Sequence, residues 1–264
     1  MDSLDQASRV RQFFDNDSSR YIQTRYEHHC ANSEEYSYIK RKQMVLDLIG
    51  NGQGRLLEVG CGPGVYTPDV LDRGFEIWGF DISPKMIHLA QEKVAGHPLS
   101  KKVHFFVGDL LNLNFERDFF DMVLCIGVLS YVTDIRKAIR KIERVLKPEG
   151  VAILQASNPF SPFEMVEVSM AQPLYGLIRD VLMREHEGCR DFNMRPYSPF
   201  RLKRICREVG LEIVSLHYYD FRIPIIHKFC PKAALIISKK LEIFEKSILF
   251  GSLGGCYLLK VQKL

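Results

Sequence analysis

The sequence predicts an α/β fold in which helices cover both faces of a doubly wound parallel sheet. Two observations predict it: short β-branched or aromatic runs recur along the chain, and stretches of helical period separate them. The runs are nearly continuous in apolar character, as expected of parallel strands that are covered on both faces. With 264 residues and no internal repeat, the chain is long enough to bury a large core in one domain, residues 1–264.

Strands are expected wherever these apolar runs occur. The first five cover residues 55–60, 75–80, 103–107, 120–126 and 150–155, and the last two cover 211–219 and 255–262. Helices are expected between them, at residues 36–49, 65–71, 84–94, 135–146 and 198–209. The middle of the chain therefore alternates strand and helix, which is typical of a doubly wound sheet.

The helix at 135–146 has the clearest pattern. Its apolar residues fall on one helical stripe, Thr133 or Asp134 can cap its start, and Pro148 follows its end. We interpret it as the crossover between the fourth and fifth strands. The opposite face of this helix is rich in lysine and arginine. We interpret it as a solvent-exposed face, and a surface that binds nucleic acid is the alternative.

Three segments depart from the alternating pattern. Residues 1–35 are expected to form a helical amino-terminal cap segment, 158–197 a lid or substrate-shaping insertion, and 224–250 an extra helical segment. In the last of these, apolar residues follow helical spacing at Ala234, Ile237, Leu241, Phe244 and Ile248. That stripe favours packing on the domain, and contact of 232–250 with a membrane surface or lipid stays open as the alternative.

Composition excludes several classes of protein. The 36 Lys plus Arg against 32 Asp plus Glu give a net charge of +4, which is mild for a nucleic-acid binder. The seven cysteines are scattered and form no Cys-x-x-Cys pair, so neither a metal site nor a disulfide framework is expected. Neither a secretory signal nor a transmembrane segment is expected, which predicts a cytoplasmic location.

A glycine-rich loop follows the first strand. Gly60, Gly62 and Gly64 occupy three of five positions where a strand gives way to a helix, and glycine there lets the backbone approach a ligand closely. Asp81 comes at the end of the second strand, where a carboxylate can accept both hydroxyls of a ribose.

Five stretches together carry a resemblance to a known family: 56–64, 79–86, 107–110, 121–132 and 144–150. In them the chain resembles the class I S-adenosylmethionine-dependent methyltransferases, near the group that acts on quinone precursors and other small molecules. The resemblance is strong over residues 36–156. It implies a Rossmann-like sheet of seven strands whose last strand is antiparallel, and S-adenosylmethionine as the cofactor.

The resemblance also implies roles for individual residues. It places the loop of Gly60, Cys61, Gly62 and Gly64 around the methionine part of the cofactor, with Glu58 orienting that loop or reaching the cofactor's amino group through water. Further residues it implies are Asp81 for the ribose, Ile82 and Leu110 for the faces of the adenine, Asp109 for its amine, backbone of Ile126 and Gly127 for the amino-acid end, and Tyr21 or Tyr26 over the cofactor.

The chemistry of the acceptor is left open by the sequence. Methyl transfer from a sulfonium needs orientation and exclusion of water more than a dedicated catalytic residue, so no catalytic residue is assigned. His186 in the insertion is a candidate base, and His88 and His217 are weaker ones. Oxygen, nitrogen and carbon atoms of a quinone-like, lipid-linked, saccharide or secondary-metabolite acceptor all remain open, as does the oligomeric state.

Competing functions are less consistent with the motifs. The glycine spacing differs from the G-x-G-x-x-G of nicotinamide dehydrogenases. Residues 125–128 lack the motif that marks amino-group methyltransferases acting on DNA bases, and Asn158-Pro159-Phe160 is read as a loop. A catalytically silent cofactor-binding scaffold and an RNA or protein methyltransferase stay as alternatives.

Overall fold

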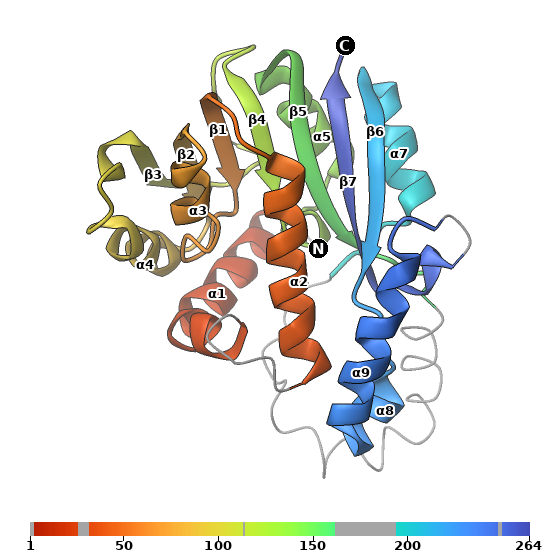
Figure 1. The fold of residues 1–264 in the computed structure, drawn as a ribbon. Coiled ribbons are helices and arrows are strands. Elements are labelled where there is room, and N and C mark those ends of the chain that lie inside the picture. The colour runs from red at the N-terminus through yellow and green to blue at the C-terminus, as the bar shows by residue number, and fades with distance from the viewer. Residues whose placement is uncertain (1–2, 26–31, 113, 162–193, 248–249) are drawn as a thin grey trace.

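A single seven-stranded sheet forms the centre of the molecule. The computed structural model describes residues 3–25, 32–112, 114–161, 194–247 and 250–264. Figure 1 shows the strands of the sheet side by side, with helices in front of the sheet and behind it. The strand order is β3-β2-β1-β4-β5-β7-β6. The bounds are β1 Gly54–Val59, β2 Phe75–Asp81, β3 Val103–Val107, β4 Phe120–Cys125, β5 Leu146–Ser157, β6 Leu211–Tyr219 and β7 Cys256–Lys263.

The direction of the strands confirms the predicted sheet. β1, β2, β3, β4 and β5 pair in parallel, whereas β7 is antiparallel to both of its neighbours, β5 and β6. β7 follows β6 in the sequence but lies between β5 and β6 in the sheet. This is the Rossmann-like arrangement with a reversed last strand that the resemblance implies.

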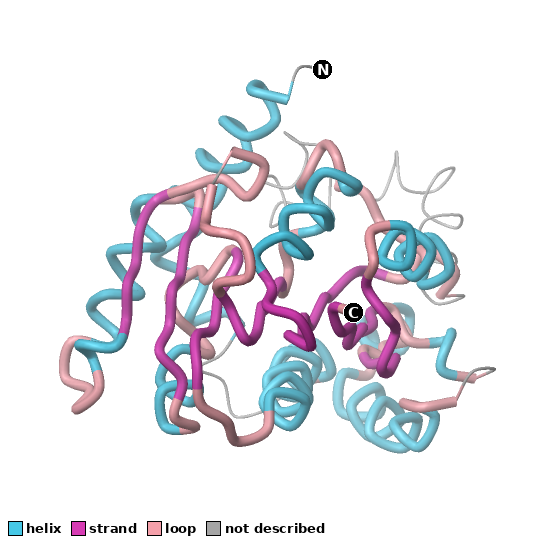
Figure 2. The backbone as a smooth tube through the Cα atoms, turned by 90° about the horizontal axis from the view of Figure 1, so that it is seen from above, coloured by secondary structure: helices cyan, strands magenta, loops and turns pink. Residues whose placement is uncertain are grey.

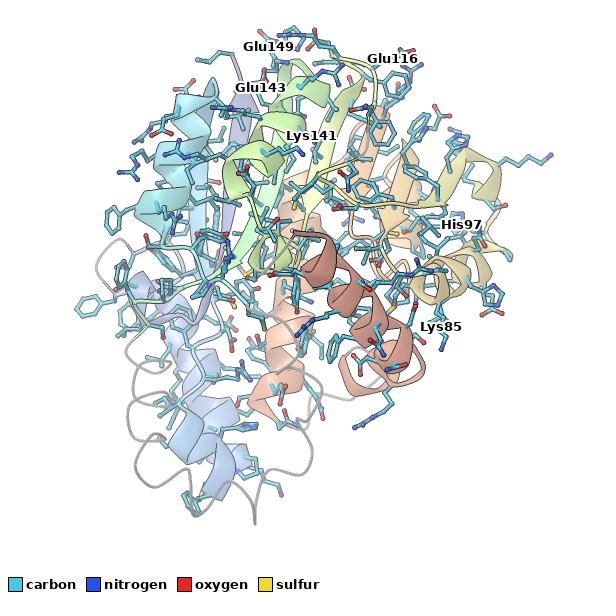
Figure 3. The ribbon with its side chains drawn as sticks, turned by 180° about the vertical axis from the view of Figure 1, so that it is seen from behind. Lys85, His97, Glu116, Lys141, Glu143 and Glu149 are labelled. Carbon is cyan, nitrogen blue, oxygen red and sulfur yellow. The ribbon has the colours of Figure 1, made fainter. Side chains whose placement is uncertain are left out.

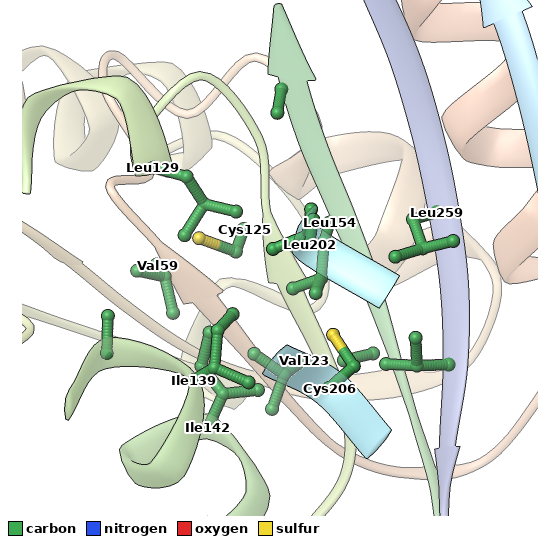
Figure 4. Packing of buried hydrophobic residues seen from close by; sticks show 14 of the residues in the cluster. Val59, Val123, Cys125, Leu129, Ile139, Ile142, Leu154, Leu202, Cys206 and Leu259 are labelled. Carbon is green, nitrogen blue, oxygen red and sulfur yellow. The ribbon is translucent and has the colours of Figure 1, made fainter. Parts of the chain in front are cut away.

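Helices on the two faces bury two apolar clusters. On one face lie α2 Ser33–Ile49 and α3 Thr67–Asp72, and on the other α5 Ile135–Val145 and α7 Pro199–Glu208. Figure 4 shows the second face, where Ile139 of α5, Leu202 of α7 and Val123 of β4 belong to one buried apolar cluster. In the view from above, the strands form a layer between the helices (Figure 2). Charged side chains such as Lys85, Glu116 and Glu149 are exposed at the periphery (Figure 3).

Helix starts follow capping side chains. Asn32 Oδ1 accepts hydrogen bonds from the N–H groups of Glu34 and Glu35, so α2 starts at 33 and not at the expected 36. Of the two candidate caps of α5, Asp134 is the one used, since its carboxylate accepts from the N–H of Lys137. Ser83 caps α4 Pro84–Val94 in the same way, through the N–H of Met86.

Two further predicted boundaries are wrong, for local reasons. α3 starts at 67 and not at 65, because the glycine loop continues as turns up to Tyr66. β5 starts at Leu146 and not at 150: Leu146 pairs with Phe120, and the register then shifts before Met122 pairs with Val151. This irregularity accommodates Pro148, which cannot donate a hydrogen bond to a regular ladder.

The amino-terminal cap segment is helical, as expected, although its bounds could not be given from the sequence. α1 spans Ser3–Arg25, which is 23 residues, and packs against α4. In Figure 1 it is the red helix beside α2. Tyr26, predicted to cover the cofactor, lies outside the described residues.

The segment at 224–250 forms two helices, α8 Pro224–Phe229 and α9 Pro231–Leu241. α9 packs on α2, with Ala234 and Ser238 buried, and Leu241 and Phe244 pack against the core of the domain. The predicted stripe therefore faces the protein over these residues and not a membrane surface. Ile248 lies outside the described residues. In the part of the chain that the structure describes, no helix is both long and apolar enough to cross a membrane.

Of the predicted insertion at 158–197, the structure describes only the two ends, residues 158–161 and 194–197. Asn158 is buried, and its Nδ2 donates to the carbonyls of Ser252 and Gly254 at 2.9 and 3.0 Å. These bonds tie the end of β5 to the turn before β7, which gives the Asn158-Pro159-Phe160 loop a structural role. Residues 162–193, with His186, lie outside the described residues.

Candidate functional site

The glycine loop and Asp81 meet at the carboxyl edge of the sheet. Val59 of β1 pairs with Phe80 of β2, so the loop after β1 and the last residue of β2 leave the sheet side by side. Gly60 and Gly62 have φ values of 64° and 54°, a left-handed conformation that favours glycine. The turn they make directs the N–H of Gly62 to Asp81 Oδ2 at 2.9 Å.

The carboxylate of Asp81 is fixed by two backbone donors. Besides the bond from Gly62, its Oδ1 accepts from the N–H of Ser83 at 2.9 Å. Each carboxylate oxygen has further acceptor capacity after one such bond. Because Asp81 lines a cavity, the remaining lone pairs are available to a ligand there.

A cavity of about 190 Å³ lies in front of these groups. Most of the predicted cofactor residues that the structure describes line it: Tyr21, Gly60, Gly62, Asp81, Ile82, Asp109, Leu110, Ile126 and Gly127. They come from α1 and from the loops after four different strands. The fold thus brings together residues that are more than a hundred positions apart in the sequence.

Three predicted residues support the loop and do not line the cavity. The side chain of Cys61 is buried against Gly79 of β2, and Gly64 packs against Ala90 of α4, where a Cβ atom would approach to 3.3 Å. Glu58 points behind the loop, where its Oε2 accepts from the hydroxyl of Thr67 at 2.8 Å. Direct contact with a cofactor was expected of Cys61 and Gly64; their surroundings are protein.

Glu58 keeps one unsatisfied oxygen. Its side chain is 3% exposed, and Oε1 has no hydrogen-bond partner within the described residues. Burial raises its pKa to about 7, against the lowering effect of the Thr67 hydrogen bond. A buried carboxylate oxygen without a partner suits an ammonium group or a water molecule, the role that the resemblance implies for this residue.

The far end of the cavity is mostly apolar. Phe80, Ile82 and Leu110 line it together with Val132. Asp109 stands at its rim, where Oδ1 accepts from the N–H of Leu111 at 3.1 Å and Oδ2 from the side-chain amide of Asn112 at 2.7 Å. Apolar walls with one acceptor at the edge suit a planar heterocycle that carries an amino group.

Helix α1 covers the cavity with residues that sequence reasoning missed. Gln6, Val10 and Phe14 line it, and the phenyl ring of Phe14 meets the ring of Tyr131 at 5.5 Å. Gln6 Nε2 donates to the carbonyl of Tyr131 at 2.7 Å. Positions 7, 10, 14 and 21 follow the spacing of one helical face, and this pattern is the signal that could have identified the residues facing the cavity.

A second hydrogen bond ties α1 to the opposite wall. The hydroxyl of Ser83 donates to Asp15 Oδ1 at 2.5 Å while Ser83 also caps α4 and holds Asp81. Ser83 therefore makes hydrogen bonds to helix α1, to the first turn of α4 and to the carboxylate of Asp81. Ser83 was included in the sequence motif but was given no role.

A second cavity, of about 650 Å³, adjoins the first. The amino-terminal half of α2 forms one wall of it, and the ends of β5 and β6 form the other. Gly127 and Tyr131 line both cavities. They therefore mark the junction between the two spaces.

At that junction, one of the two backbone hydrogen-bonding groups of Gly127 already has a partner in the protein. Its N–H donates to Gln155 Oε1 at 2.8 Å, so the N–H that was expected to face a cofactor is already used. What Gly127 has left to offer a ligand is its carbonyl group.

The candidate histidine bases lie elsewhere. His88 is exposed on α4 beside Glu92, and His217 makes hydrogen bonds with Glu245 at 3.0 Å and Ser215 at 3.1 Å. Neither lines either cavity. Their surroundings give them no part in chemistry at this site.

Comparison with known families decides the identity of the chain. Residues 57–154 match the family described as "Methyltransferase domain", the span that runs from the glycine loop to β5. The chain is a class I S-adenosylmethionine-dependent methyltransferase. S-adenosylmethionine is accordingly its cofactor.

Two curated relatives of this methyltransferase illustrate its neighbourhood. The putative methyltransferase YqeM of Bacillus subtilis (strain 168) is 31% identical over 117 residues, which cover 43% of this chain and 46% of that protein. The demethylmenaquinone methyltransferase of Staphylococcus aureus (strain JH9) is 26% identical over 226 residues, or 83% of this chain and 91% of that protein.

A solved structure shows the same fold along the whole chain. Magnesium protoporphyrin IX methyltransferase from Synechocystis PCC 6803, with bound S-adenosylhomocysteine, superposes with a TM-score of 0.65 at 15% identity. The match covers 98% of this methyltransferase and 100% of that chain.

The residues present fit S-adenosylmethionine. An ideal Cβ atom at Gly62 would meet nothing within 4 Å, so the loop leaves open space beside the donors that orient Asp81. Asp81 has acceptor capacity for two hydroxyl groups, and Glu58 Oε1 is an unsatisfied acceptor behind the loop. The ribose hydroxyls of the cofactor match the acceptor capacity of Asp81, and Glu58 would reach the ammonium group through water.

Cofactor affinity is expected to fall in acid. Burial raises the pKa of Asp81 to about 6, the backbone N–H groups of Ser83 and Gly62 opposing the shift. Only the ionised carboxylate accepts two hydroxyl bonds at full strength, so the Kd for S-adenosylhomocysteine should rise about tenfold per unit below about pH 6 and level off above it. Calorimetry from about pH 5 to about pH 8 measures this.

Asp81→Asn is the control for that titration. It should bind weakly and with a much flatter pH profile, because the titrating carboxyl group of Asp81 is gone. The carboxyl group of Glu58 is unchanged in this variant. A wild-type affinity that increases as the pH falls through this range would contradict the assignment.

Proposed function

We propose that the protein transfers a methyl group from S-adenosylmethionine to a small molecule bound in the second cavity. One observation carries the proposal: the two cavities meet at Gly127 and Tyr131. A cofactor in the first space and an acceptor in the second would face each other across this junction. Close approach of two reactants in a fixed orientation is the main requirement of such a displacement.

The cofactor would be held by the residues around the first cavity. Asp81 would accept the ribose hydroxyls, Ile82 and Leu110 would contact the adenine, and Asp109 would accept from its amine. The lining of the cavity supports these roles, as does the spare acceptor capacity of Asp81. The loop around Gly62 would approach the methionine part, with Glu58 supporting the loop from behind through the hydroxyl of Thr67.

When bound, S-adenosylmethionine supplies an electrophilic methyl group on a sulfonium. The protein's part is to orient and to exclude water. Helix α1 serves the second purpose, since Val10 and Phe14 lie over the first cavity and its hydrogen bonds at Gln6 and Asp15 fix it in place. We assign no general base.

The size and shape of the second cavity favour a small-molecule acceptor. It lies between α2 and the strand ends, and its lining includes Tyr38, Pro159 and Tyr219 beside several polar groups. A mixed aromatic and polar lining suits a molecule of moderate size with a planar part. The similarity to a demethylmenaquinone methyltransferase supports a quinone-like acceptor as the first class to test.

Labelling tests the proposal directly. The protein is incubated with S-adenosylmethionine tritiated on the methyl group and with separated small-molecule, RNA and protein fractions of a cell extract. Label should enter the small-molecule fraction and should be lost with Asp81→Ala. Transfer into RNA or protein instead would contradict the proposal, and so would a complete absence of transfer.

A further inference from the structure

We infer that Gln155 selects the acceptor by donating a hydrogen bond to an oxygen atom of it at the junction of the two cavities. The inference rests on the proposed function, because it concerns the substrate of the same site. It adds the chemical class of that substrate: an uncharged molecule with a hydroxyl or carbonyl oxygen close to the methylated position.

The orientation of the Gln155 amide is set by its neighbour. The N–H of Gly127 donates to Oε1 at 2.8 Å. A backbone N–H has no acceptor capacity, so the oxygen and not the nitrogen of the amide must face it. The NH₂ group is thereby turned to the other side of the side chain.

That NH₂ group is a hydrogen-bond donor accessible from the second cavity. Gln155 is 6% exposed and lines the second cavity. Within the described residues, its Nε2 has no hydrogen-bond partner in the protein. A ligand that offers an acceptor here gains a hydrogen bond, whereas one that displaces water without offering an acceptor leaves this donor unsatisfied.

The position of this donor gives it influence on specificity. Gly127, to which Gln155 is bonded, lines both cavities, so the NH₂ group lies close to the path between cofactor and acceptor. An amide NH₂ donates and cannot accept. It therefore favours an oxygen lone pair near the reacting position, and it disfavours an ammonium group, which has no lone pair, and an aromatic amine, whose lone pair is delocalised into the ring.

The charges around the cavity favour an uncharged ligand. Among the described lining residues, the charged ones are two carboxylates and two guanidinium groups: Glu34, Asp220, Arg41 and Arg222. Arg222 donates to both oxygens of Asp220, at 2.5 and 2.8 Å. With this balance, neither an anion nor a cation gains an overall electrostatic advantage.

The test uses two probes of nearly the same shape, 4-fluorophenol and 4-fluoroaniline. Each is titrated, by ¹⁹F NMR line broadening, with protein saturated with S-adenosylhomocysteine. Both probes are uncharged near neutral pH, and they differ in the group offered to Gln155. The wild-type protein is expected to bind the phenol about tenfold more tightly than the aniline.

Gln155→Glu separates the two functions of the side chain. A glutamate keeps an oxygen for the N–H of Gly127 but loses the NH₂ donor, so the preference for the phenol should fall to about twofold or less while affinity for S-adenosylhomocysteine stays within about twofold. Gln155→Met, which can neither donate nor accept, should also lose the preference. Gln262→Glu is the matched control: Gln262 Nε2 donates to the carbonyl of Glu149 at the far end of β7, and the preference should persist there.

Three results would overturn the inference: equal binding of the two probes to the wild type, no binding of either, or a preference that persists in both Gln155 variants. Melting temperatures confirm that each variant is folded. These failures are distinct from a failure of the proposed function, which is read from the labelling of the small-molecule fraction. Labelling of that fraction without a phenol preference would reject the role of Gln155 alone.

Discussion

Replacing Asp81 by alanine is expected to weaken the binding of S-adenosylhomocysteine by about ten- to several-hundred-fold. The carboxylate is held by the N–H groups of Gly62 and Ser83 and would accept two ribose hydroxyls. Hydrogen bonds to a charged group contribute about 1.5–3 kcal/mol each, and the two are unlikely to add fully. Isothermal titration calorimetry at neutral pH gives the affinity.

Asp72→Ala provides the comparison for that variant. Asp72 is an exposed aspartate at the end of α3, beside His97 and away from the cavity, and its removal should leave the affinity unchanged. If Asp81→Ala bound the ligand as tightly as the wild type, Asp81 would not be the ribose acceptor.

Gly62→Ala is expected to lower cofactor affinity by about tenfold or more, with a moderate loss of stability. The φ of Gly62 is 54°, and an L-residue in that region costs about 1–2 kcal/mol. An added Cβ atom would meet no protein atom within 4 Å, so the methyl group would stand in the space that the loop leaves for the ligand. The melting temperature should fall by about 2–8 °C.

Gly50→Ala isolates the backbone cost from the loss of space. Gly50 ends α2 with a φ of 67°, and a Cβ atom there also meets nothing within 4 Å. Its substitution should lower the melting temperature to a similar extent and leave the affinity for S-adenosylhomocysteine within about twofold of the wild type. Equal affinities of the two variants would show that Gly62 does not border the cofactor.

The parallel core could be predicted from local patterns because each of its elements carries its own signal. The apolar runs around Leu57 and Val123 are strands buried on both faces, and Asp134 marks the start of α5. The glycine loop and Asp81 are close in space because consecutive parallel strands end at one edge of the sheet. For this part of the site, strands that are consecutive in the sequence are also neighbours in the sheet.

The contacts of the amino-terminal cover and the second cavity could not be predicted in the same way. Gln155, Asp220 and the amino-terminal half of α2 are brought together by packing alone, and no spacing rule connects them. The bond between Ser83 and Asp15 joins positions 68 residues apart. The sequence also gave no means of knowing that Gln155 would use the N–H of Gly127, since hydrogen bonds between loops depend on the final register of β4 and β5.

The place of β7 in the sheet has a consequence for how the protein matures. Within the described residues β6 pairs only with β7, so until residues 256–263 have been synthesised β6 has no strand to join and β5 shows an open edge. Open strand edges invite pairing with other chains. Nascent chains stalled after β6 should therefore be clients of chaperones, and a deletion that removes β7 should produce inclusion bodies and not a weakened enzyme.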